Sequence, residues 1–143
     1  MMRAFRDRLV DDATFRGLFA GVSTTATAPV YPTFMEVTGR YPQVIYSEIL
    51  GRTRPGLTAG QGQITFNIQV QNWSGTSPHA THISISDRIN QLLDDQVVTG
   101  LSVTGSAAIA LLVLRAGSTP VNYDPQRKVY DRFITYDYET LYQ

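Results

Sequence analysis

Two histidines, His79 and His82, are the side chains of this sequence best suited to metal or acid–base chemistry. They stand three residues apart at the start of an expected helix, so they share one side of it. A zinc site needs at least three protein ligands, and no third ligand is close in a chain without cysteine. The sequence also has no Gly-x-Ser-x-Gly segment, so a nucleophilic triad has little support. We therefore expect both histidines to be exposed in the first helical turn, with no metal and no cofactor.

Carboxylates give no better support for catalysis. Asp11–Asp12 and Asp94–Asp95 are adjacent pairs. Neighbouring residues on a helix point in different directions, so neither pair forms a carboxylate dyad. Solvated helix ends are the simpler interpretation, and the sequence predicts a protein that is not an enzyme.

A glycine-rich segment, residues 51–63, carries Arg52 and Arg54. It lacks the Gly-Lys-Ser/Thr end of a phosphate-binding loop. The two arginines could contact phosphates or pair with a carboxylate on a neighbouring subunit, and we favour the subunit contact. The segment links two strand patterns and exceeds the usual hairpin length of about 2–5 residues, which is typical of functional loops.

Four tyrosines near the end of the chain, Tyr130, Tyr136, Tyr138 and Tyr142, could form a platform for stacking nucleic-acid bases. Such platforms lie among clustered Lys and Arg, whereas acidic residues are interleaved here. Packing between strands under a helix is the better interpretation of the middle pair. Tyr142 could anchor a partner.

The composition indicates one domain of 143 residues with few charges. Charged residues make up 17%, below the roughly 25% of a typical soluble domain, and 12 basic residues balance 12 acidic ones. This balance argues against a protein that wraps nucleic acid by electrostatics, and it is typical of an assembly component. The longest apolar run is too short to span a membrane, and the charged start is no signal peptide. We expect assembly in a reducing cytoplasm.

The elements that must position these residues centre on residues 64–93. Apolar side chains alternate from Ile64 to Val70, and a helical pattern containing Ile85, Ile89 and Leu92 follows. The strand's other face would present an uncharged polar set to solvent: Thr65, Asn67, Gln69 and Gln71. A solvated strand usually carries charges there, so this set predicts a surface that meets another protein. Phe66, Ile68, Ile89 and Leu92 should form the core.

The rest of the pattern predicts an α+β fold. Residues near Phe5 and Leu9 form a short amphipathic helix, and Asp12 caps a second helical piece. Strands are expected within residues 43–50, 109–115 and 129–141, with a short edge segment at residues 30–38. The order α-β-β-α-β-β predicts a single domain, residues 1–143, whose largely antiparallel sheet is covered on one face by helices.

Several of these segments together resemble the tail completion (tail terminator) proteins of long-tailed bacteriophages, over roughly residues 5–141. The resemblance rests on Val30-Tyr31-Pro32, on Tyr41-Pro42-x-Val44-x-Tyr46-x-x-Ile49-x-Gly51, on Ile64-x-Phe66-x-Ile68-x-Val70-x-x-Trp73, on a helix with Ala80, Ile85, Ile89 and Leu92, and on a final aromatic strand.

The resemblance implies a ring, commonly a hexamer, that caps the tail tube, stops its growth and joins it to the head connector in the neck of the virion. The partners would be further copies of the chain, the tail tube protein and the connector or stopper protein. DNA would pass through the lumen without specific binding. The family has no catalytic residues to carry over. Two alternatives stay open: another neck component, such as a head-completion or connector protein, and a small enzyme or ligand-binding module with a pocket under the sheet.

Overall fold

The computed structural model describes residues 2–19, 21–33, 41–50, 59–71, 78–94, 96–101 and 109–142. These residues form three helices and seven strands, in the order α1 (Met2–Val10), α2 (Ala13–Arg16), β1 (Val30–Pro32), β2 (Gln43–Leu50), β3 (Ala59–Val70), α3 (Pro78–Leu93), β4 (Gln96–Leu101), β5 (Ile109–Ser118), β6 (Asn122–Asp124) and β7 (Val129–Tyr142). The fold is α+β, as the sequence predicts. The expected order α-β-β-α-β-β is not the one found, because additional short elements flank the longer ones.

The strands form one sheet in the order β1-β2-β3-β7-β5-β4, and β6 pairs with β7 beside the end of β5. β1 runs parallel to β2, whereas the other pairings among the described strands are antiparallel. The sheet is therefore mixed, with one parallel pairing at its edge beside antiparallel pairings between the other described strands. β1 forms this parallel pair at the edge of the sheet, with Val30 opposite Val44.

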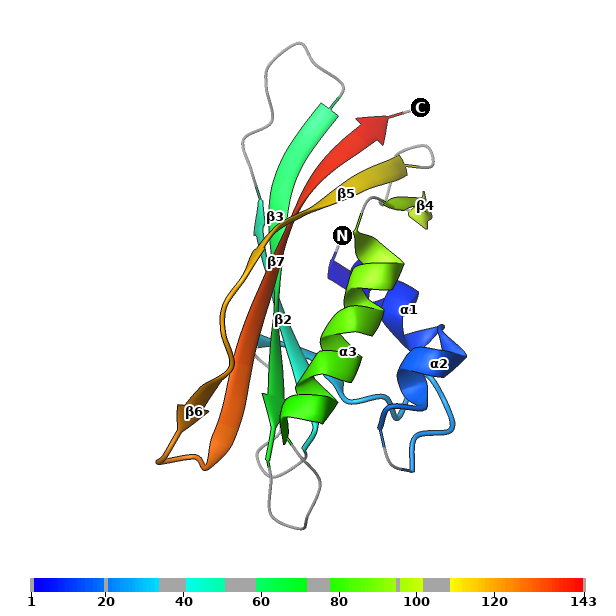
Figure 1. The fold of residues 1–143 in the computed structure, drawn as a ribbon. Helices are drawn as coiled ribbons and strands as arrows, with labels where there is room; N and C mark the ends of the chain where they lie inside the picture. The colour runs from blue at the N-terminus through cyan, green and yellow to red at the C-terminus, as the bar shows by residue number, and fades with distance from the viewer. Residues whose placement is uncertain are drawn as a thin grey trace.

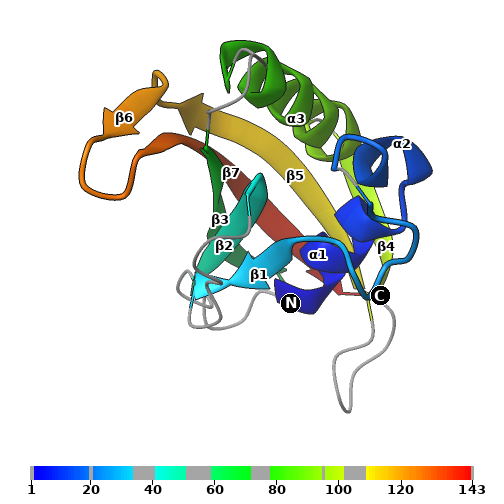
Figure 2. The same ribbon diagram turned by 90° about the horizontal axis from the view of Figure 1, so that it is seen from below.

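The helices lie together on one side of the curved sheet (Figures 1 and 2), and the core lies between the two layers. α3 follows β3 along the chain and packs back against it. The predicted core residues Phe66, Ile68 and Ile89 are fully buried and Leu92 is 8% exposed, which confirms that prediction. Alternation along β3 therefore places Ile64, Phe66, Ile68 and Val70 toward the helices.

The N-terminal helices close one end of this core. Phe5 and Leu9 of α1 are fully buried, as their spacing predicts. Asp12 caps α2, because its Oδ1 accepts a hydrogen bond from the backbone N–H of Phe15 at 2.6 Å. The same carboxylate accepts hydrogen bonds from Nε of Arg88 at 2.9 Å and from Nη2 of Arg88 at 2.6 Å, so Asp12 also links α2 to α3.

Candidate interaction surface

The sheet has a second face, turned away from the helices, which we call the outer face. None of the described helices covers it (Figures 1 and 2). Paired residues of neighbouring antiparallel strands point to the same side, so the register defines its members. They include Gln43, Ile45 and Ser47 of β2, Gln63, Thr65, Asn67 and Gln69 of β3, and Asp131, Phe133, Thr135, Asp137 and Glu139 of β7.

The middle of the outer face is a row of polar contacts between β3 and β7. The hydroxyls of Thr65 and Thr135 lie 3.1 Å apart, and Nε2 of Gln63 donates to Oδ1 of Asp137 at 2.9 Å. Phe133, beside Thr135 on the same face, keeps 42% of its surface exposed. An aromatic ring on an open sheet face is apolar area that a partner could cover.

Gln69 is the exception among the predicted outward residues. It is only 1% exposed, because Gln43 from β2 lies opposite and its Nε2 donates to Oε1 of Gln69 at 2.8 Å. The expectation that Gln69 lies on an open surface is therefore wrong. Thr65 and Asn67 are partly exposed, and Gln71 is exposed just beyond the end of β3.

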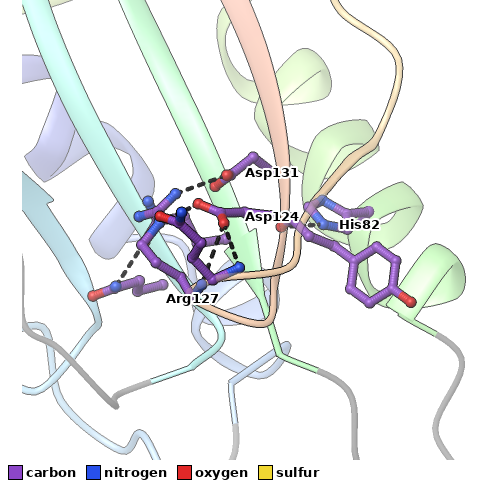
Figure 3. Close-up of polar contacts among 8 residues, drawn as sticks. His82, Asp124, Arg127 and Asp131 are labelled. Carbon is purple, nitrogen blue, oxygen red and sulfur yellow. Dashed lines mark hydrogen bonds and ion pairs between the residues drawn. The ribbon is translucent and has the colours of Figure 1, made fainter.

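One end of the outer face carries an arrangement that the sequence analysis missed (Figure 3). Arg127 bridges two carboxylates: its Nε lies 2.8 Å from Oδ2 of Asp124 and its Nη2 lies 2.8 Å from Oδ2 of Asp131. The hydrogen bond from Arg127 lowers the pKa of Asp124. Burial raises the pKa of Asp131, and the charge of Arg127 opposes that rise. The Asp124/Arg127 spacing of three residues could have indicated the first pair, whereas the second depends on how the turn folds.

His82 corrects a prediction. It is fully buried rather than exposed, and its Nε2 donates to the backbone carbonyl of Tyr130 at 2.8 Å, tying α3 to β7 (Figure 3). The side chain of His79 lies outside the described residues. Within the described part of the chain, no three His, Cys, Asp or Glu side chains come together as a metal site.

On the helix side of the sheet, the hydroxyl of Tyr138 donates to Oε1 of Glu48. Tyr138 is 3% exposed and the ring of Phe5 lies 5.3 Å away. Burial, followed by the neighbouring carboxylate, raises the pKa of Tyr138. The phenol therefore stays protonated and acts as a structural donor.

The structure describes the other predicted site residues only partly. Arg52 and Arg54 lie outside the described residues. The expected loop of residues 51–63 is wrong in its second half, because β3 begins at Ala59 and Gly62 pairs with both Leu50 and Tyr138. The backbone of Tyr142 lies in β7 opposite Ile109, and its side chain is outside the described residues.

Among the described residues, no helix is long and apolar enough to cross a bilayer. No protein-family model and no curated protein matches the chain.

Proposed function

We propose that this chain is a structural subunit that assembles into a ring through the outer face of its sheet. The observation that carries the proposal is the division of the sheet into two unlike faces. Helices cover one face. The other face is free of described helices and bears the uncharged outward residues of β3, carboxylates on β7 and the exposed ring of Phe133. The outward residues of β3 are uncharged, so this row lacks the charges that usually keep a solvated strand from packing against other chains.

The chemistry of the outer face suits burial in an interface. Thr65 and Thr135 are within hydrogen-bonding distance of each other, so covering them leaves neither hydroxyl without a partner. Phe133 would gain from leaving water, at about 25 cal/mol for each Å² of apolar area. Zero formal net charge also removes the long-range repulsion that keeps many proteins monomeric.

The resemblance to tail completion proteins gives this assembly its proposed role. The ring would cap the tail tube of a long-tailed bacteriophage, end the growth of the tube and present the surface that joins the head connector. Contacts between unlike patches on successive subunits close a ring when their rotation closes, and a hexamer is the expected number. DNA would slide through the lumen, because a nearly neutral wall gives phosphates few attractive contacts.

The test is growth arrest of tubes. The purified chain is added to its cognate tail tube protein during polymerisation, and tube lengths and ends are measured by negative-stain electron microscopy. We expect shorter tubes with added density at one end. Phe133→Asp should act less well, since it replaces exposed apolar area with a further negative charge on the outer face. Asp87→Asn on the exposed side of α3 is the control. Unchanged lengths and bare ends would overturn the proposal, and binding to the portal or connector alone would assign the chain to another neck layer.

A further inference from the structure

At one end of the sheet, β6, residues 125–128 and the start of β7 form a hairpin whose turn extends beyond the last pair of β3 with β7, Val70 opposite Tyr130 (Figures 1 and 2). We call it the arm. β6 pairs with β7, through Asn122 opposite Asp131 and Asp124 opposite Val129. Arg127 fixes the turn by bonding to Asp124 and Asp131 across it (Figure 3). The arm is therefore held in one shape before it meets anything, which lowers the entropic cost of binding.

The arm presents an aromatic ring on β6 and a cation in its turn. Tyr123 is 42% exposed and stacks on Tyr130 with ring centroids 4.7 Å apart. Arg127 pairs with two carboxylates, whereas no carboxylate is found within ion-pair distance of exposed Lys128 among the described residues. Lys128 is also the non-glycine residue that the turn holds at a positive φ, 55°. The turn thus displays a lysine where Asn or Gly would be the less strained choice.

The opposite end of the outer face has complementary features. Asp137 is exposed, and its carboxylate accepts a hydrogen bond from an uncharged group, Nε2 of Gln63. Glu139 follows on the same face. Within the described part of the chain, neither carboxylate has an ion-pair partner. Phe133 lies along the same strand and is 42% exposed. Four residues of strand place the ring of Phe133 about 13 Å from Asp137, so a tyrosine and a lysine could contact the ring and the acidic patch separately.

We infer that the arm of one copy docks on the outer face of a second copy, with Lys128 against Asp137 and Glu139, and Tyr123 against Phe133. The contact cannot form within one chain. Lys128 directly precedes β7 and Asp137 lies within it, nine residues later, so the extended strand holds them about 30 Å from each other. The arm and its target are different patches, so the contact is heterologous and suits a ring. This inference rests on the proposed function and names the surfaces that would join the subunits.

A charge swap tests the contact. Lys128→Asp and Asp137→Lys should each weaken self-association about tenfold or more, measured by sedimentation across a concentration series. The double variant should restore association, because the opposite charges then face each other in reversed order. Asp tolerates a positive φ, so Lys128→Asp should not strain the turn. Asp87→Lys, an equal charge change on the exposed side of α3, is the matched control and should leave association unchanged.

The outcomes separate the two claims. Wild-type rings whose association is unaffected by either single swap would overturn the arm contact and leave the proposed function standing. If both single variants lose self-association and the double variant does not recover it, the pairing of these residues would also be overturned. A wild-type chain that never associates would overturn both. Urea unfolding of each variant shows whether a loss reflects a failure to fold, and a second pair of variants, Lys128→Asn with Asp137→Asn, repeats the test without charge reversal.

Discussion

Gly62 sits where a side chain has no room, and Gly62→Ala is the sharpest test of the packing between β3 and β7. A Cβ at this position would lie 2.3 Å from both Cζ and the hydroxyl oxygen of Tyr138, and 2.8 Å from Cε1. Unstrained carbon contacts lie at about 3.5–4.0 Å, so the ring would have to move by about 1 Å. Tyr138 is held by the ring of Phe5 and by its hydrogen bond to Glu48, so it cannot move without losing contacts.

The magnitude follows from these contacts. Overpacking costs about 1–3 kcal/mol, and disturbing the hydrogen bond to the carboxylate adds up to about 1.5–3 kcal/mol. Ala gains about 0.5–1 kcal/mol over Gly inside a strand. We therefore expect Gly62→Ala to lower the free energy of unfolding by about 2–4 kcal/mol, out of the roughly 5–15 kcal/mol typical of a domain. Urea unfolding measures it as a lower midpoint with an unchanged slope.

Two controls make the result specific. Gly117 is another glycine in a strand, and a Cβ added there would have no atom within 4 Å. Gly117→Ala should therefore leave the free energy of unfolding unchanged or raise it slightly. In a Tyr138→Leu background the three clashing atoms are gone, and Gly62→Ala should cost little more than the background itself. A wild-type midpoint for Gly62→Ala, or the same loss in both backgrounds, would refute the packing described here.

Three further predictions follow from the core, the Asp12 cap and the charge balance. Leu92→Ala should lower the free energy of unfolding by about 2–5 kcal/mol because it empties a buried site between α3 and the sheet, and an unchanged thermal midpoint would contradict this. Asp12→Asn keeps the cap but loses the charge that pairs with Arg88, which should cost on the order of 1 kcal/mol at neutral pH. Arg88 lowers the pKa of Asp12 below 3.8, so this stabilisation is complete above about pH 4 and is lost as pH falls through the lowered pKa. The deficit of the Asn variant in urea unfolding should therefore shrink toward zero in acid, and a pH-independent deficit would contradict the assignment. Duplex DNA should bind weakly at physiological salt in an anisotropy titration, and submicromolar binding with a steep salt dependence would favour a neck protein that grips DNA.

Local periodicity explains which parts of the fold could be predicted. The alternation in β3 and the helical spacing in α3 each depend on residues close in sequence, and both identified the buried faces, including Phe66 and Ile89. Asp12 was identified as a cap because capping depends on the next three residues. The parallel pairing of β1 with β2 joins Val30 to Val44 at an edge and has no local signal.

The errors have a shared physical cause, because each involves a partner distant in sequence. His82 is buried by its bond to a carbonyl 48 residues later, and Gln69 is buried by Gln43, 26 residues earlier. Gly62 favoured a loop because glycine weakens a strand pattern, whereas here it makes room for the ring of Tyr138. The candidate surface was therefore found in part, through Thr65 and Asn67, and the arm with Arg127 was not anticipated.

Self-assembly is the central claim, and the mass of the chain in solution tests it most directly. Sedimentation equilibrium at tens of micromolar, followed by negative-stain imaging of the same sample, should give a closed species with a central opening. For a chain of 15.9 kDa, a hexamer has a mass of about 95 kDa. A mass of 15.9 kDa throughout the concentration range, with no rings on tail tubes when the tube protein is added, would contradict the account.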